Sequence, residues 1–217
     1  MNDNDDGYVV CGWYTPGYAE RAATLVESLI ALGEPHDFVA VPDEPGGWER
    51  ATMRKPGMIQ AAMDRHSRKA VVFLDVDCVA FEPLRPLART RADIAVHLIA
   101  GRRSRGYGRL FGRTTTMVFR PTQVAHDLVN EWVAISANAP PGYVDQHTLT
   151  EAIARTSGLV IENLDARWCA MTKDEVERPA IVHTGAARYA NKMPGWRRVF
   201  HLLTYRARVA SYGATSS

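Results

Sequence analysis

The chemistry that this chain can perform is most visible at Asp75 and Asp77, which directly follow an apolar run over residues 70–74. An uninterrupted apolar run of this length is typical of a strand that is buried on both faces of a sheet. Two carboxylates this close together repel each other, and desolvation at the end of a buried strand disfavours their charged form. A divalent cation removes both problems, and Mn²⁺ or Mg²⁺ suits carboxylate oxygens and substrate phosphates. We therefore expect a metal site here, with a solvated turn as the alternative.

Strand and helix patterns alternate along the chain on both sides of this pair. Strands are expected over residues 8–11, 37–41, 70–74, 93–99, 115–119, 158–161 and 180–182. Helices are expected from Thr15, as N-cap, to about Gly33, over 55–66, from Pro121 past Ile135, over 144–155 and over 194–210. This alternation predicts an α/β fold with a mostly parallel sheet. Open sheets of this kind bind ligands at the carboxyl ends of their strands, which is where Asp75 and Asp77 lie.

The composition is that of an ordinary globular protein, with 217 residues, 46% hydrophobic and 23% charged. We expect a disordered tail over residues 1–7, one folded domain over 8–196, and a basic helix and tail over 197–217. The start of the chain is acidic and no apolar run is long enough for a signal peptide or a membrane span. The interpretation is a cytoplasmic protein, with peripheral attachment to the inner membrane as an extension of it.

Three cysteines, Cys11, Cys78 and Cys169, are far apart and lack C-x-x-C spacing. Their odd number and their separation favour buried free thiols in a reducing compartment over a disulfide or a zinc site.

Positive charge gathers in two stretches, although the formal net charge is only +2. Arginines fill residues 102–120 with no acid among them, and arginines with one lysine follow Glu177, again without acids. Such fields favour anionic ligands, and a solvated basic face is the alternative, above all for the C-terminal stretch. We expect the loop over residues 102–113 to order over the bound donor or to meet an anionic acceptor. The final basic helix should pack on the sheet, with contact to an anionic membrane as the alternative. No nucleic-acid partner is expected, because no recognisable binding module accompanies the basic residues.

The stretch over residues 71–79 resembles the strand and D-x-D motif of glycosyltransferases with the GT-A fold. It is most similar to the bacterial nucleotide-diphospho-sugar transferases related to glycosyltransferase family 8. Further segments match that family in their order along the chain: residues 14–18, Lys55, residues 115–119, Trp132 with Asp145-Gln146, and residues 181–185 with Lys192. The resemblance spans about residues 8–196 and implies a Rossmann-like α/β/α sandwich of the GT-A type. One departure is Thr114-Thr115-Thr116, where the family often has asparagine, serine and glycine.

The resemblance also implies residue roles for transfer of a sugar from a nucleotide-diphosphate donor, with uridine diphosphate as the expected nucleotide. Asp77 and His183 would bind Mn²⁺ or Mg²⁺, and Asp75 would share the metal and the donor ribose. The remaining donor-binding residues would be Tyr14, Thr15, Tyr18, Lys55, Thr115, Gly185 and Lys192. Asp145 and Gln146 would lie at the reacting sugar, although Asp145 alone is equally typical of a helix N-cap.

Asp145 would be a general base in an inverting enzyme. In a retaining enzyme, which the resemblance favours, Asp145 or Gln146 would stabilise an oxocarbenium-like state. The acceptor would be a glycan, a lipid-linked glycan or a small molecule. Two other interpretations remain: a phosphatase of the haloacid dehalogenase type, whose nucleophile motif is also D-x-D after a strand, and a non-catalytic domain that binds nucleotides or anions. The phosphatase fits poorly, because a strand, a helix and a strand precede the motif and Asp174-Glu175 lies in a polar stretch.

Overall fold

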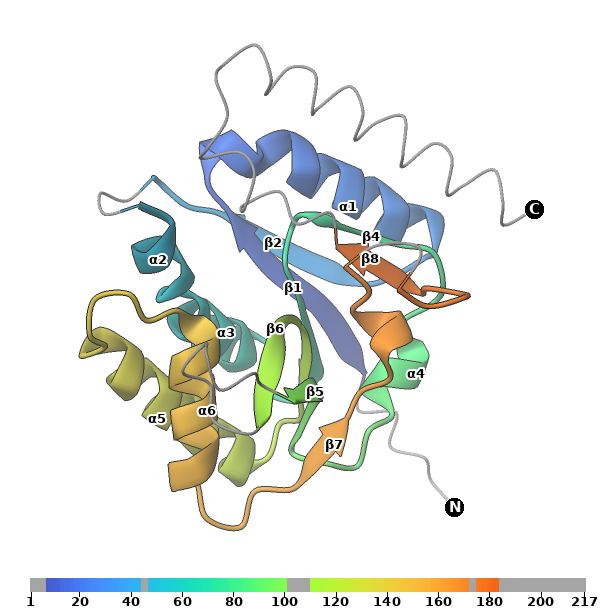
Figure 1. Ribbon diagram of the computed structural model, residues 1–217. Helices are drawn as coiled ribbons and strands as arrows, with labels where there is room; N and C mark the ends of the chain where they lie inside the picture. Colours follow the sequence, from blue (N-terminus) through green and yellow to red (C-terminus); the bar gives the residue numbers. More distant parts are fainter. Residues whose placement is uncertain (1–6, 44–46, 101–109, 172–174, 184–217) are drawn as a thin grey trace.

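The computed structural model describes residues 7–43, 47–100, 110–171 and 175–183 (Figure 1). The predicted tail before Gly7, most of the arginine-rich loop, Gly185, Lys192 and the predicted C-terminal helix therefore lie outside the described residues.

A six-stranded sheet forms the centre of the fold, with the strand order β2-β1-β3-β6-β5-β7. The strands are β1 Tyr8–Tyr14, β2 His36–Ala40, β3 Ala70–Leu74, β5 Ile94–Ala100, β6 Leu110–Phe119 and β7 Ile161–Asn163. Only β6 runs opposite to the others in this sheet, since it pairs antiparallel with both β3 and β5 while the remaining pairs are parallel. The predicted α/β fold with a mostly parallel sheet is confirmed.

Helices cover both faces of this sheet and make it the middle layer of a sandwich (Figure 1). They are α1 Ala19–Ala31, α2 Gly47–Thr52, α3 Lys55–Arg65, α4 Arg85–Ala88, α5 Gln123–Ala137 and α6 Asp145–Arg155. On one face, α1 packs through Leu25 and Leu29 in a cluster that includes Val72 from β3. On the other face, α3, α5 and α6 form a cluster around Phe73 and Trp132. Because successive residues of β3 enter different cores, the whole strand must be apolar.

Local chemistry explains where the helices begin and end. The hydroxyl of Thr122 accepts a hydrogen bond of 3.2 Å from the backbone N–H of Ala125, so α5 begins at Gln123 rather than at the predicted Pro121. Thr15 makes no side-chain cap, and it precedes a short 3-10 turn over Pro16–Tyr18 before α1. Gly33 follows α1 with a φ of +70°, as expected of a residue just beyond a helix end.

A second, two-stranded sheet pairs β4 Cys78–Ala80 with β8 Ile181–His183 in antiparallel orientation. The register places His183 opposite Cys78, the residue after Asp77. The three-residue strand β4 was not predicted from the sequence. It is the element that ties the end of the described chain to the acidic motif.

One predicted strand is misplaced. Residues 158–161 were expected to form a strand, but Gly158 has a φ of +73° and β7 begins only at Ile161. The backbone N–H of Val160 donates to the carboxylate of Asp93 at 2.9 Å, so pairing with β5 begins one residue later. Within the described part of the chain, no helix combines the length and the apolar character that crossing a bilayer requires.

Candidate active site

A cavity of about 550 Å³ opens at the carboxyl ends of β1 and β3. Every predicted site residue within the described part of the chain lines this cavity: Tyr14, Thr15, Tyr18, Lys55, Asp75, Asp77, Thr115, Asp145, Gln146 and His183. These residues come from segments far apart in the sequence. Tyr14 and Asp75 lie at or just beyond the carboxyl ends of β1 and β3, where open α/β sheets bind their ligands. Thr115 lies within β6 and His183 within the small sheet, and both line the same cavity.

Several cavity residues were not predicted from the sequence, among them Trp13, Thr52, Phe111, Arg113, Thr114, His147 and Met171. Trp13 and Thr114 each adjoin a predicted residue, which is the signal that could have identified them. Arg113 was expected in a mobile loop. It lies instead in β6, where its guanidinium donates to the carbonyl of Cys169 at 2.8 Å and to Glu175 at 3.0 Å.

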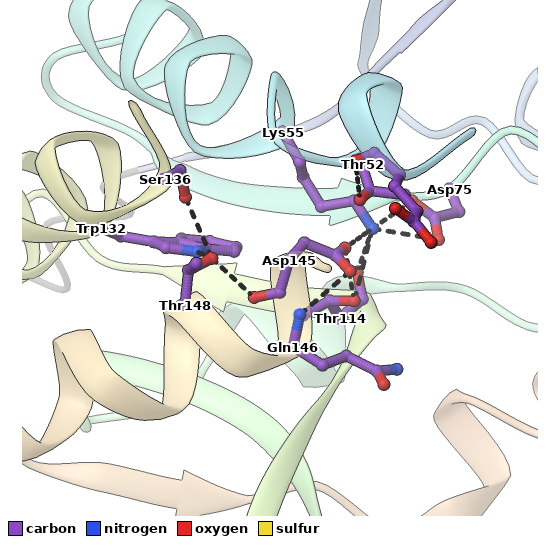
Figure 2. Close-up of polar contacts among 10 residues, drawn as sticks. Thr52, Lys55, Asp75, Thr114, Trp132, Ser136, Asp145, Gln146 and Thr148 are labelled. Carbon is purple, nitrogen blue, oxygen red and sulfur yellow. Dashed lines mark hydrogen bonds and ion pairs between the residues drawn. The ribbon is translucent and has the colours of Figure 1, made fainter. Parts of the chain in front are cut away.

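Lys55 joins two carboxylates of the cavity that come from different elements, as Figure 2 shows. Its ammonium lies 2.9 Å from Oδ1 of Asp75 and 2.6 Å from Oδ2 of Asp145. The same ammonium donates to the backbone carbonyl of Thr114 at 3.1 Å. Only 5% of Lys55 is exposed, so the alternative of a solvated surface charge is wrong for this residue. Burial works to lower the pKa of Lys55, but Asp145 and Asp75 outweigh it and raise the pKa.

The surroundings of the Asp75 carboxylate disfavour its charged form despite the contact with Lys55. Burial raises the pKa of Asp75 to about 7, and Asp77 and Asp145 act in the same direction against Lys55. The backbone N–H of Asp75 donates to the carbonyl of Thr115 at 3.0 Å, which fixes the end of β3 against β6. The site therefore has more carboxylate charge than Lys55 neutralises.

His183 lies fully buried in β8, on the side of the cavity where Asp77 adjoins β4. Its Nε2 is 2.9 Å from the hydroxyl of Thr116, whereas its buried Nδ1 has no hydrogen-bond partner among the described residues. Burial, with Lys55 and Arg113, lowers the pKa of His183 to about 3, so the imidazole is neutral. A neutral imidazole with a ring nitrogen free of hydrogen bonds is a common metal ligand in proteins. The ligand atoms of Asp75, Asp77 and His183 do not all lie within 4.8 Å of one another.

Asp145 is the first residue of α6 and not its N-cap. The N-cap is Val144, whose backbone N–H donates to Nδ1 of His147 at 3.1 Å. The carboxylate of Asp145 accepts hydrogen bonds from the hydroxyl of Thr114 at 2.7 Å and from the backbone N–H of Gln146 at 3.0 Å. Asp145 is 4% exposed and points toward Lys55 (Figure 2). The N-cap interpretation therefore does not explain this aspartate.

A buried hydroxyl connects the start of α6 to α5. Thr148 donates to the carbonyl of Asp145 at 3.2 Å and accepts from the indole N–H of Trp132 at 2.9 Å. The hydroxyl of Ser136 donates to the hydroxyl oxygen of Thr148 at 3.0 Å, as Figure 2 shows. These bonds hold the first turn of α6, and with it Asp145 and Gln146, against the long helix.

Comparison with known proteins identifies the family and the fold of the chain. The family model described as nucleotide-diphospho-sugar transferase matches residues 30–194. A structure of a glycosyltransferase involved in the glycosylation of the major capsid of PBCV-1 has a TM-score of 0.62 at 18% identity, covering 83% of this chain and 95% of that one. The galactosyltransferase LgtC, in complex with donor and acceptor sugar analogs, has a TM-score of 0.54 at 13% identity, covering 81% of this chain and 86% of that one.

The glycosyltransferase GlyE of Streptococcus pneumoniae TIGR4 has a TM-score of 0.54 at 12% identity, covering 82% of this chain and 55% of that one. No curated protein sequence matches the chain. The structural likenesses are too distant in sequence to show more than the fold, which is GT-A, while the family model covers most of the chain. The transferase interpretation is thus favoured over a phosphatase or a non-catalytic domain. The chain belongs to the nucleotide-diphospho-sugar transferase family, and the enzyme that it forms is a glycosyltransferase.

Proposed function

We propose that the enzyme uses Mn²⁺ or Mg²⁺ to transfer a sugar from a uridine-diphosphate donor to the hydroxyl of a glycan, lipid-linked or small-molecule acceptor, with retention at the anomeric carbon. The observation that carries the proposal is the clustering of Asp75, Asp77 and Asp145 around one cavity with a single buried lysine. A pyrophosphate cannot enter beside these carboxylates without additional positive charge.

The types of donor atom at the cavity suit the divalent cation that this family commonly uses, and its binding would draw together ligand atoms that do not all lie within 4.8 Å of one another. Asp75, Asp77 and His183 would hold it, because they offer carboxylate oxygens and a neutral imidazole whose Nδ1 has no partner among the described residues. When bound, the cation stabilises the negative charge that develops on the departing nucleoside diphosphate. Gly185 and Lys192, which were predicted to bind the donor, remain predictions.

Tyr14, Thr15 and Tyr18 line the cavity at the end of β1, which supports a nucleoside-binding role for this part of it. The guanidinium of Arg21 lies 5.3 Å from the centre of the Tyr18 ring, which fixes that ring and leaves it half-buried. We assign the uracil and ribose to this part of the cavity. The donor sugar then lies toward Thr115, whose hydroxyl oxygen is buried without a hydrogen-bond partner among the described residues. A sugar hydroxyl would satisfy it.

The surroundings of Asp145 favour charge stabilisation over proton abstraction. Its carboxylate already accepts hydrogen bonds from Thr114 and from the Gln146 backbone, and it contacts the Lys55 ammonium. A carboxylate with its oxygens occupied in this way is poorly placed to take a proton from an acceptor hydroxyl. It remains suited to stabilise positive charge on the sugar ring as the glycosidic bond breaks. This arrangement supports retention and gives Asp145 and Gln146 their roles at the reacting sugar.

A thermal-shift panel of nucleoside diphosphates and nucleotide sugars, with and without Mn²⁺, tests the proposal. We expect uridine diphosphate and one or more of its sugars to raise the melting temperature of the wild-type protein only when metal is present. Asp77→Asn should abolish that shift, while Asp64→Asn, on the exposed face of α3, should leave it unchanged. Equal stabilisation with and without metal, or an unaffected Asp77→Asn variant, would contradict the assignment.

A further inference from the structure

Three potential metal ligands meet at the end of α3 that is far from the active-site cavity. Cys11 and Asp37 are direct partners in the parallel ladder between β1 and β2, so their side chains share one face of the sheet. Helix α3 covers that face and ends at Arg65, and His66 follows it. His66 is 11 residues from Lys55, or about 16 Å along a helix at 1.5 Å per residue. None of Cys11, Asp37 and His66 lines the cavity.

The side chains of these three residues converge closely. One potential ligand atom from each, the sulfur of Cys11, a carboxylate oxygen of Asp37 and a ring nitrogen of His66, all lie within 4.8 Å of one another. Nε2 of His66 is 2.9 Å from Oδ2 of Asp37. Cys11 is 1% exposed, whereas 30% of the Asp37 side chain and 23% of the His66 side chain are exposed. Solvent therefore reaches the cluster through Asp37 and His66 and not through Cys11.

We propose that Cys11, Asp37 and His66 form a second metal site, separate from the active site and selective for Zn²⁺ or a cation of similar chemistry. Thiolate, imidazole and carboxylate are the ligand types that zinc combines in proteins, whereas Mg²⁺ and Mn²⁺ prefer oxygen. Three protein ligands leave a fourth position for water on the exposed side. On binding, the thiol gives its proton to solvent and its sulfur forms the bond to the metal.

The thiol of Cys11 belongs to the apolar cluster under α3 and lies beside the ion pairs of Asp37. Arg65 donates to Oδ2 of Asp37 from Nε at 3.0 Å and from Nη2 at 2.9 Å, and together with His66 it satisfies that oxygen. Without a metal the thiol of Cys11 stays protonated, because burial, reinforced by Asp37, raises its pKa to about 12. A cation bound by all three side chains would stabilise their close approach, because each would be one of its ligands.

Arg65 sets the strength of the site. Hydrogen bonds to a ligating carboxylate orient it, as outer-shell groups commonly do. The guanidinium is also a cation bound to Oδ2 of Asp37, so it competes with a metal for that carboxylate. We therefore expect Arg65→Gln to tighten zinc binding, an effect that a purely structural ion pair would not produce. Because the three ligands come from β1, β2 and the residue after α3, zinc should also raise the melting temperature.

The test is a cobalt and zinc titration of the full-length protein after treatment with a chelator. We expect Co²⁺ to give a sulfur-to-cobalt charge-transfer band that Zn²⁺ abolishes at one equivalent. Cys11→Ser and His66→Gln should remove the band and weaken zinc binding by at least about tenfold. Cys169→Ser, which removes another buried thiol, should retain it. His66 is partly exposed, so His66→Gln keeps the fold, which circular dichroism verifies.

Asp77→Asn separates this site from the proposed catalytic metal. The cobalt–thiolate band should persist in that variant even though metal-dependent nucleotide binding is lost, so the two proposals succeed or fail independently. Absence of the band in the wild-type protein would overturn the second site. So would a band that survives both Cys11→Ser and His66→Gln, or one that disappears in Asp77→Asn.

Discussion

The active site depends on contacts between residues that are distant in the sequence, and Lys55 makes two of them. Its identity as a basic residue before the acidic strand was visible in the sequence, but its partnership with Asp145 was not. Lys55 and Asp145 are far apart in the sequence. Because α3 and α6 pack on the same face of the sheet, the Lys55 ammonium lies 2.6 Å from the Asp145 carboxylate. The cluster of Cys11 with Asp37 and His66 is of the same kind, since it depends on strand register and on the length of α3.

Replacing Lys55 with methionine should destabilise the protein and stop transfer. Removal of one partner of a buried ion pair leaves uncompensated charge, which costs about 3–5 kcal/mol of unfolding free energy. Here both Asp75 and Asp145 lose their counter-ion. Urea denaturation measures the loss. Lys69→Met, at an exposed position, is the matched control and should change stability little. A Lys55→Met protein as stable as the control would contradict the buried ion-pair network.

Replacing Thr148 with valine should lower the turnover rate more than it changes the Michaelis constant for the donor. The variant leaves Trp132 and Ser136 without their acceptor and removes the bond that fixes the Asp145 carbonyl. Buried donors left without partners cost about 1–3 kcal/mol each in stability. Steady-state kinetics with Thr156→Val, at the other end of α6, as control separates positioning from simple destabilisation. Equal kinetic effects in the two variants would contradict a positioning role.

At the scale of elements, the sequence predicted the central strands of the large sheet well and the short strands β4 and β7 poorly. The strand over Ala70–Leu74 was predicted with its observed bounds, because five consecutive apolar residues need two buried faces. β4 was missed because three residues carry no periodicity. β7 was misplaced because its apolar residues begin in a turn, where Val160 is 57% exposed and its N–H bonds to Asp93 instead of a neighbouring strand.

Gly12 and Gly57 should respond in opposite ways to substitution by alanine. A Cβ at Gly12 would lie 2.5 Å from Cε1 of Phe38 and 2.7 Å from the carbonyl of Leu74, so it would strain the packing of β1 between its neighbours. We expect a loss of about 1–3 kcal/mol. A Cβ at Gly57, within α3, meets nothing within 4 Å, and alanine there should add about 0.5–1 kcal/mol. Thermal or urea denaturation of both variants checks the close strand packing; similar effects would contradict it.

At the scale of the whole molecule, two sheets cooperate to build one site. The large sheet brings Asp75 to the cavity, and the small sheet of β4 and β8 brings in His183 by pairing it with Cys78. The sequence located His183 through its family resemblance, because nothing in its local pattern indicates which distant strand it will pair with. Gly185, Lys192 and the predicted C-terminal basic helix lie outside the described residues, and their roles remain predictions.

Chelation should make the enzyme lose donor affinity without losing its fold. The carboxylates at the cavity outnumber Lys55, so an anionic donor is repelled once the divalent cation is removed. We expect at least about a tenfold weaker binding of uridine diphosphate after chelator treatment, with recovery on addition of Mn²⁺ or Mg²⁺. Calorimetric titration measures the affinity, and circular dichroism verifies the fold. Unchanged affinity without metal would contradict this electrostatic account.

The most direct test is a crystal of the enzyme grown with Mn²⁺ and uridine diphosphate, examined for anomalous scattering from manganese. The account predicts a manganese peak in the cavity in contact with Asp77 and with Nδ1 of His183, and a pyrophosphate on the same ion. A peak elsewhere, or a nucleotide bound away from Asp75 and Asp77, would contradict it.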